Sequence, residues 1–277
     1  MRVSSIFAVL LSGSMLAIPQ IAIADSVEVV QEPAIGQLIE KEKAAYNSGN
    51  YAESEAILRL MIRREPSNAG FYNNLGVSLK AQGKLEEAIE AYQQAIRLDP
   101  DYAVPYNGLG NALRSQGKLE EAIEAYQQAI RLDPDNAVPY NGLGNALRSQ
   151  EKLEEAIEAY QQAIRLDPDN AVPYNGLGVV LSDQGKLEEA IEAYQQAIRL
   201  DLDYAFPYNG LGNALSDQGK LEEAIEAYQQ AIRLDPDYAP SYNGLGIALK
   251  NQGKLEEAIE AYQQAIRLDP DYAPSYN

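Results

Sequence analysis

The residue type best suited to bind a ligand in this sequence is asparagine, which returns at a fixed interval. An asparagine side chain offers two hydrogen-bond donors and one acceptor, so a row of them can pair with the backbone of an extended peptide of any sequence. Six asparagines stand 34 residues apart: Asn73, Asn107, Asn141, Asn175, Asn209 and Asn243. Three more stand four residues further on: Asn111, Asn145 and Asn213. The pattern predicts a peptide-binding row, with solvated asparagines copied by duplication as the alternative.

Charged residues follow the same interval, and their sign changes along the chain. The early copies carry Lys80, Arg114 and Arg148, whereas the later ones carry Asp183 and Asp217. We therefore predict a binding groove that is basic toward its first half and acidic toward its second. A ligand segment would place an acidic group near the two arginines and a basic group near the two aspartates. Drift among duplicated copies is the alternative explanation.

The composition leaves little material for catalysis. Among 277 residues there is no histidine, cysteine or tryptophan, which removes the commonest general base, the thiol nucleophile and the usual zinc ligands. No phosphate-binding loop or serine triad is visible, and loop carboxylates such as Asp133 and Asp135 fall short of the roughly six to eight oxygens that calcium takes. The formal net charge of −19 argues against nucleic acid or an anionic membrane surface as a partner. We expect neither an enzyme nor a cofactor.

A repeated unit must position these side chains. The phrase KLEEAIEAYQQAIRLDP occurs six times with starts 34 residues apart, although Leu202 replaces the last proline in the fourth occurrence. A fixed period of this length is typical of a repeat array. In the copy 103–136, apolar residues follow helical spacing at Leu119, Ala122, Ile123, Tyr126, Ala129 and Ile130. This spacing predicts an amphipathic helix from Lys118 to Asp133, ended by Pro134.

The first half of each copy predicts a second, poorer helix. In the copy 103–136 this helix is expected over Pro105 to Gln116, and Gly117 suits the tight turn that follows it. The interior glycines Gly108 and Gly110 each cost about 1 kcal/mol against alanine. Because such glycines recur in every copy, they predict close backbone packing. Each copy is therefore expected to be two antiparallel helices, and the fold class to be all-α.

These residues resemble the tetratricopeptide repeat. The family's characteristic positions are matched by Tyr106, Leu109, Gly110, Leu113, Ala122, Tyr126, Ala129 and Pro134. The resemblance implies an α-solenoid, a right-handed superhelix of antiparallel helix pairs with a concave groove lined by the first helices. Positions are counted from the first residue of each copy, so Ala103 is position 1 of the copy 103–136. On a helical wheel, positions 2, 5, 9, 12 and 13 share the side opposite the apolar residues. The family lines its groove with the same positions, which carry the asparagines and charges described above.

The two ends of the chain differ from the middle. Residues 1–24 combine Arg2, a long apolar run and a closing Ala22-Ile23-Ala24, which predicts a cleaved signal peptide; a retained membrane anchor is the alternative. A linker over 25–34 and a divergent copy over 35–68 follow. The close copies are 69–102, 103–136, 137–170, 171–204, 205–238 and 239–272, and residues 273–277 start an incomplete one.

Three local departures carry further expectations. Glu151 replaces the turn glycine of its copy, which predicts strain if that residue is left-handed. Leu202 in place of proline predicts a looser junction after the copy 171–204. In the last helix, the residues expected to be partly uncovered are Ala258, Tyr262, Ala265 and Ile266. Such a strip would allow self-association.

The sequence thus predicts an exported, non-enzymatic scaffold that binds protein or peptide segments and assembles, chaperones or docks other proteins. After signal cleavage no direct membrane binding is expected. The repeat wording resembles that of repeat proteins in photosynthetic bacteria, which implies the periplasm or the thylakoid lumen, with secretion as a further option. The alternatives are a self-associating structural protein and, more remotely, the substrate-binding array of a glycosyltransferase that lacks its catalytic domain.

Overall fold

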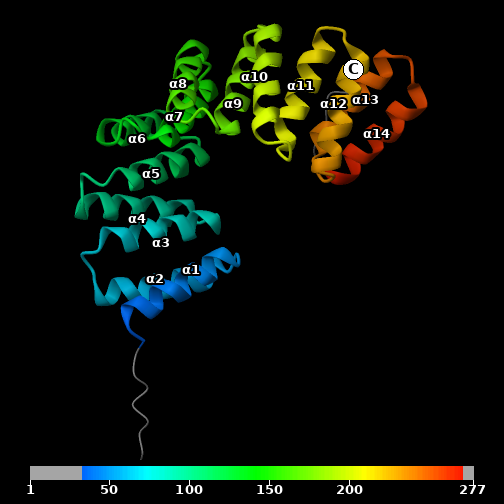
Figure 1. Cartoon of the computed structure of the whole chain (residues 1–277). Helices are drawn as coiled ribbons and strands as arrows, with labels where there is room; N and C mark the ends of the chain where they lie inside the picture. The colour runs from blue at the N-terminus through cyan, green and yellow to red at the C-terminus, as the bar shows by residue number, and fades with distance from the viewer. Residues whose placement is uncertain (1–32, 271–277) are drawn as a thin grey trace, which may run out of the picture. The chain divides into compact units, whose positions relative to one another are not determined.

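A computed structural model describes residues 33–270, which form fourteen α-helices and no strand (Figure 1). The first helices of the copies are α1 (Ile35–Asn47), α3 (Ala69–Ala81), α5 (Ala103–Ser115), α7 (Ala137–Ser149), α9 (Ala171–Asp183), α11 (Ala205–Asp217) and α13 (Ala239–Asn251). The second helices are α2 (Tyr51–Arg64), α4 (Leu85–Leu98), α6 (Leu119–Leu132), α8 (Leu153–Leu166), α10 (Leu187–Leu200), α12 (Leu221–Leu234) and α14 (Leu255–Leu268). The predicted all-α class and helix pairs are confirmed. The predicted signal peptide 1–24, most of the linker and the incomplete copy 273–277 lie outside the described residues.

Each helix packs against the next one along the chain, as expected for an α-solenoid (Figure 1). The first helices of neighbouring copies also contact one another from α3 to α13, so they form one continuous row. The helices all belong to a single compact unit that begins at Ile35. Within residues 33–270, no helix is both long and apolar enough to span a membrane.

Local chemistry explains where the helices of the copy 103–136 begin and end. After α5, Gly117 takes a left-handed φ of 76°. Its N–H donates to the carbonyl of Arg114 at 3.0 Å, and the N–H of Lys118 donates to that of Leu113 at 3.0 Å. These two bonds satisfy carbonyls that the helix end would leave unpaired, and glycine allows the turn at no steric cost. At the far end of α6, Asp133 caps the helix and Pro134 stops it.

A buried tyrosine ring explains the glycines inside the first helices. Tyr126 on α6 is 0% exposed and lies between Gly110 of its own copy and Gly142 of the next. A Cβ atom added at Gly110 would lie 2.7 Å from the ring, and one added at Gly142 would lie 2.5 Å from it. Both distances are shorter than van der Waals contact allows, so only glycine fits at these positions. The predicted close packing of backbone is confirmed.

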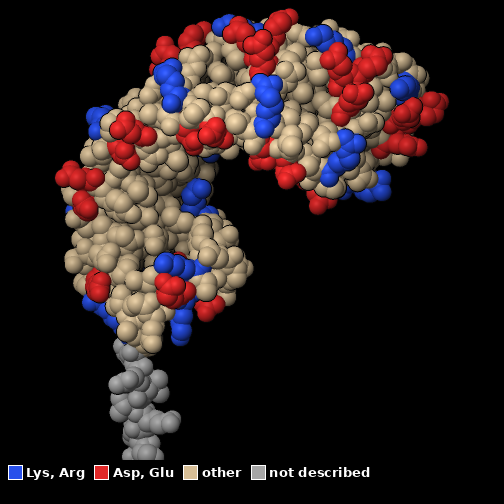
Figure 2. Space-filling view, viewed as in Figure 1, with Lys and Arg blue, Asp and Glu red and all other residues tan. Residues whose placement is uncertain are grey.

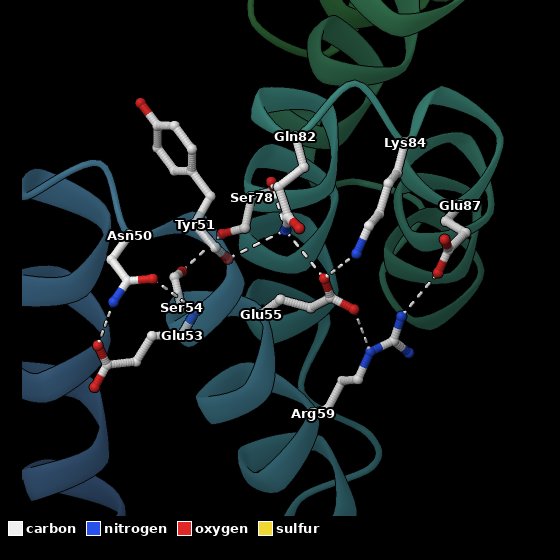
Figure 3. A network of polar contacts seen from close by, with 10 residues as sticks. All are labelled: Asn50, Tyr51, Glu53, Ser54, Glu55, Arg59, Ser78, Gln82, Lys84 and Glu87. Atoms are coloured by element: carbon white, nitrogen blue, oxygen red, sulfur yellow. Dashed lines mark hydrogen bonds and ion pairs between the residues drawn. The ribbon is translucent and has the colours of Figure 1, made fainter.

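The first junction, between α2 and the α3–α4 pair, adds polar contacts to its apolar packing (Figure 3). Leu58 replaces the tyrosine there, and a buried chain of hydrogen bonds crosses three helices. The Ser54 hydroxyl lies 2.7 Å from Oε1 of Glu42, to which it donates, and 2.8 Å from the hydroxyl of Ser78. Burial of these polar groups is tolerated because they satisfy one another. A ring lies at each later junction, so this one has a different interior.

An ion-pair cluster on the outside of the same junction is centred on Glu55 (Figure 3). Lys84 Nζ and Arg59 Nε each lie 2.8 Å from its carboxylate, and Gln82 Nε2 donates to it at 3.0 Å. Arg59 also pairs with Glu87 at 2.9 Å. The Lys84 ammonium is the largest cause that lowers the pKa of Glu55, to about 2. The cluster therefore joins α2 to the α3–α4 turn with a carboxylate that stays charged.

The C-terminal helix α14 corrects one expectation. Ala258 and Ala265, predicted to be partly uncovered, are 2% and 3% exposed, because they face α13 rather than the open side. The exposed apolar strip of α14 consists of Leu255, Ile259 and Ile266. The predicted exposure of Ile266 is confirmed.

The other local departures are resolved in different ways. Glu151 has a φ of 60°, where each neighbouring copy has glycine, so the predicted left-handed turn is confirmed. At the Leu202 junction the Tyr208 hydroxyl donates to the Leu202 carbonyl at 3.4 Å, as Tyr106 donates to Pro100 at 3.2 Å. The same hydrogen bond forms at the junctions after Pro100 and Pro134, and the looseness expected from Leu202 stays a prediction.

Candidate functional site

The asparagines at position 5 of each copy lie along the row of first helices. Four of them, Asn73, Asn107, Asn141 and Asn243, have a buried Oδ1 atom without a hydrogen-bond partner in the described part of the chain. A buried amide oxygen without a partner is rare in proteins, because it has lost its bonds to water. These four side chains are therefore candidates for contact with a ligand.

The two remaining asparagines of the predicted row are engaged within the protein. Asn209 Oδ1 accepts a hydrogen bond from Ser241 Oγ at 3.2 Å. A hydrogen bond from Asn175 lowers the pKa of Tyr204 against the larger rise caused by burial. The asparagines at position 5 are thus not equivalent. Three successive ones, Asn73, Asn107 and Asn141, have side-chain oxygens without a hydrogen-bond partner among the described residues.

The asparagines at position 9 hold the buried tyrosines. Asn111, Asn145 and Asn213 accept hydrogen bonds from the hydroxyls of Tyr126, Tyr160 and Tyr228 at 2.9, 3.0 and 2.7 Å. Burial raises the pKa of Tyr160 to about 12, so its hydroxyl keeps its proton and remains a donor at neutral pH. These three amide oxygens therefore have a structural partner, which sequence reasoning missed because the tyrosine lies fifteen residues further along the chain.

The charged residues of the predicted site fall into two groups. Arg148 Nε lies 2.7 Å from Asp183 Oδ2, so these two predicted ligand contacts pair with each other. Arg114 lies near Tyr126 and partly offsets the rise that burial causes in the pKa of that tyrosine. Lys80 and Asp217 make no ion pair with any residue in the range 33–270. Basic and acidic side chains are interspersed over the face in Figure 2, with wide uncharged areas between them.

A hollow of about 270 Å³ opens where α1, α3 and α5 meet. Its lining includes four residues of the predicted site: Asn73, Asn107, Asn111 and Lys80. Tyr92, the counterpart of Tyr126 in the copy 69–102, also lines it. No acidic side chain contributes to the lining, although the chain as a whole is strongly acidic. The structure thus brings the early members of the predicted site together in one concave place.

Apolar side chains on the first helices add to this surface. Val104, Val138, Val172 and Phe206 occupy position 2 of their copies and are all exposed. The edge of the Phe206 ring also packs against Tyr204 and Tyr238, with ring centroids 5.8 and 5.1 Å away. The helical wheel placed position 2 on the groove side, although these residues were not among the predicted binding residues. An exposed row of valines beside amides suits the backbone and side chains of an extended peptide.

The row of helix pairs, with a polar surface along its first helices and a closed apolar interior, defines an α-solenoid of the protein-interaction class. A family model for cilia and flagella-associated protein 70 C-terminal domain, of tetratricopeptide repeat type, matches residues 34–274. The chain therefore belongs to this tetratricopeptide repeat family, and the resemblance drawn from the sequence is confirmed. No curated protein sequence matches the chain significantly.

Solved structures agree on the fold. The Cut9–Hcn1 hetero-tetramer of the APC/C matches with a TM-score of 0.74 at 21% identity, over 88% of this chain and 48% of that one. The chain thus spans about half the length of that protein. MamA matches with a TM-score of 0.52 at 30% identity, over 58% of this chain and 95% of that one. YrrB, described as a tetratricopeptide repeat protein with an unusual peptide-binding site, matches with a TM-score of 0.51 at 29% identity, over 66% and 95%. The fold is that of a scaffold for protein–protein interaction.

Proposed function

We propose that the chain is a non-enzymatic scaffold that binds peptide segments of other proteins along its first helices, and so docks or assembles them. The observation that carries the proposal is the succession of Asn73, Asn107 and Asn141, whose buried amide oxygens have no partner among the described residues. A peptide backbone would supply the missing N–H donors in any sequence once the side-chain amides turn toward it, since their oxygens have almost no accessible surface as they stand. The likeness to YrrB, a protein with a peptide-binding site, supports the same class of ligand.

A capture experiment with a matched control tests this proposal. Residues 25–277 contain the whole compact unit, so this part of the chain is immobilised and exposed to an extract of the cells that produce it. The groove variant changes Asn73, Asn107 and Asn141 to alanine. The control variant changes the exposed residues Glu90, Glu124 and Glu158 on the second helices to alanine. We expect the wild type and the control to retain the same partner and the groove variant to lose it; equal retention by all three would refute binding along the first helices.

A second candidate function is self-association, favoured by the exposed strip of Leu255, Ile259 and Ile266 on α14. A second copy cannot extend the array through its own α1, because Glu40 stands where later copies have the glycine that receives the tyrosine ring. The contact would have to be of another kind, such as α14 against α14. Light scattering of the wild type and of Ile259→Glu at high concentration tests it. A larger mass for the wild type alone supports self-association, and equal monomer masses reject it.

Export is part of the same proposal. The signal-peptide pattern of residues 1–24 is its support, and the periplasm, the thylakoid lumen and the medium are the compartments it allows. Mass spectrometry of the protein from its native cells tests this point. A mature N-terminus at Asp25 supports cleavage and export, whereas a retained Met1 or Arg2 argues for a membrane anchor or for no export.

A further inference from the structure

The first junction differs from the later ones at five positions that lie together. At the later junctions a tyrosine ring lies between two glycines. At the first junction Leu58 replaces the tyrosine, and Glu42 and Asn74 replace the two glycines. Ser54 and Ser78 stand where the later copies have alanine or, once, valine. These substitutions turn an apolar packing site into a polar one that contains a carboxylate.

The Glu42 carboxylate is buried without a cation. Glu42 is 7% exposed, and its Oε1 accepts a hydrogen bond from the Ser54 hydroxyl at 2.7 Å. This bond uses the single proton of that hydroxyl, so Ser78 is the donor in the contact between the two serines. Glu42 forms no ion pair with any residue in the range 33–270. The serines thus satisfy their own hydroxyls but leave the charge of Glu42 uncompensated.

A charge in this place is not needed for the hydrogen bonds. The amide oxygen of a glutamine at residue 42 could accept the same bond from Ser54. Burial of a charged group is costly unless the charge is paired, whereas burial of a bonded amide costs much less. A buried Glu42 is therefore better explained by a cation that comes from outside the chain.

Glu42 lines a pocket of about 170 Å³ between α1 and α3, the α1–α3 pocket. The rest of its lining is Lys43, Tyr46, Asn47, Asn74 and Val77. Lys43 does not neutralise Glu42, because its ammonium pairs with Glu40 at 3.1 Å. Lys80 lines the neighbouring hollow between α1, α3 and α5 and not this pocket. The α1–α3 pocket therefore has a carboxylate with room for a cation beside it.

The other side chains of the pocket suit an ammonium group on an aliphatic chain. Asn47 and Asn74 are exposed, and each has an amide oxygen that can accept a hydrogen bond from an ammonium. The oxygen of Asn74 already accepts one bond, from Asn73 at 3.2 Å, and can accept a second. Val77 and Tyr46 are half-buried and offer apolar surface to methylene groups, and the Tyr46 ring also attracts a cation.

We infer that the α1–α3 pocket binds a primary ammonium group on an aliphatic chain, as a lysine side chain of a bound peptide or a free diamine presents it. The ammonium would donate to Glu42 and to the amide oxygens of Asn47 and Asn74. A guanidinium fits less well, because it prefers both oxygens of a carboxylate and Ser54 already occupies one of them. For a lysine ligand, the inference rests on the proposed function and adds which side chain the first copies select.

Fluorine NMR titration of residues 25–277 tests the inference with three labelled probes. N-trifluoroacetyl-lysine N-methylamide carries the ammonium, the norleucine analogue has the same chain without it, and the arginine analogue carries a guanidinium. We expect the lysine probe to bind about tenfold more tightly than either analogue, since charge-assisted hydrogen bonds are the strong ones. Equal binding of the lysine and norleucine probes, tighter binding of the arginine probe, or no binding would overturn the inference.

Competition distinguishes the two sources of the ammonium. Unlabelled 1,4-diaminobutane and N-acetyl-lysine N-methylamide are each titrated against the bound lysine probe. Displacement at a lower concentration of the diamine assigns a free amine as the ligand, and the opposite order assigns a lysine side chain. Either order supports the ammonium site, whereas failure of both compounds to displace the probe contradicts it.

Glu42→Gln assigns the effect to the pocket, because it removes the charge and keeps an acceptor for Ser54. It should weaken the lysine probe at least about tenfold. Without a ligand, its melting temperature should equal or exceed that of the wild type, since an uncompensated buried charge is lost. Glu90→Gln, an exposed change on α4, should leave affinity and melting temperature unchanged. An unchanged affinity in Glu42→Gln would refute the site, and a lower melting temperature would show that the chain itself compensates the charge and would refute it too.

The two proposals fail separately. If no probe prefers the α1–α3 pocket while the groove variant still loses its partner, the ammonium site is wrong and the scaffold function stands. If the groove variant keeps its partner, the scaffold function along the first helices is wrong, whatever the probes do.

Discussion

Arg148 on α7 and Asp183 on α9 form an ion pair, with Nε and Oδ2 2.7 Å apart, across the boundary between two copies. These residues stand where the predicted charge of the groove changes from basic to acidic. In the absence of a ligand they neutralise each other, so an acidic group of a ligand would have to displace Asp183 to reach Arg148.

The pair should contribute little to stability. Arg148 and Asp183 are 40% and 41% exposed, and exposed ion pairs contribute at most about 1 kcal/mol. We expect Asp183→Asn and Arg148→Gln each to lower the free energy of unfolding by less than about 1 kcal/mol. Urea titration of both variants and of the double variant measures the coupling between the two residues. A coupling well above this value would mean that the pair fixes the angle between copies.

Glu151→Gly should stabilise the protein. The φ of 60° at Glu151 places an L side chain in the left-handed region, at a cost of roughly 1–2 kcal/mol that glycine does not bear. We expect a higher melting temperature, measured by circular dichroism. The reverse change at the equivalent turn, Gly185→Glu, should lower it. A melting temperature that fails to rise in Glu151→Gly would mean that the glutamate side chain stabilises its turn in another way.

Gly142→Ala should destabilise the array because its new methyl group would lie 2.5 Å from the Tyr126 ring. The overpacking should lower the free energy of unfolding by about 1–3 kcal/mol. Gly36→Ala is the matched control, since no atom lies within 4 Å of a Cβ added there. That change should be neutral or raise stability by up to about 1 kcal/mol. Equal effects of the two substitutions in urea titration would reject the role of the ring.

Acid should remove the contribution of Glu55. Its pKa in the folded protein is lowered from 4.5 to about 2, first by the Lys84 hydrogen bond. A lowered pKa stabilises the fold above pH 4.5, and the stabilisation is lost as the pH falls toward 2. We therefore expect wild type to melt above Glu55→Gln at pH 6, with the difference shrinking below pH 4.5. The exposed Glu90→Gln serves as control. A difference that is independent of pH would show that the Glu55 charge is not what holds the junction.

The helix pairs were predictable because their signals act within a few residues. Gly117 ends α5 and Pro134 follows α6 by steric rules that need no knowledge of the fold. The glycines inside the first helices were correctly taken as sites of close packing, but the sequence could not name Tyr126 as the ring they receive. That contact depends on how one copy stacks on the next.

The site was only partly predictable for the same reason. The helical wheel placed the asparagines on one side, yet it could not show that Asn111 is bonded to Tyr126 while Asn73 has an unpaired oxygen. The hydroxyl of Tyr126 has an acceptor in Asn111, whereas the corresponding residue for Tyr92 is Val77. Each of these residues lies fifteen positions before its tyrosine and comes close to it only when the helix pair folds. Ala258 was misplaced because the wheel shows which residues share a face, not which neighbour covers it.

Photo-crosslinking tests the central claim, that ligands bind along the first helices, most directly. A benzophenone side chain is introduced at Val104 on α5, beside the hollow, and in a second protein at Glu124 on α6, which points to solvent. Each protein is irradiated in an extract of its native cells, and the adducts are identified by mass spectrometry. The scaffold account predicts a peptide adduct of a single partner from residue 104 and no adduct from residue 124. Adducts formed at residue 124 but not at residue 104 would contradict it.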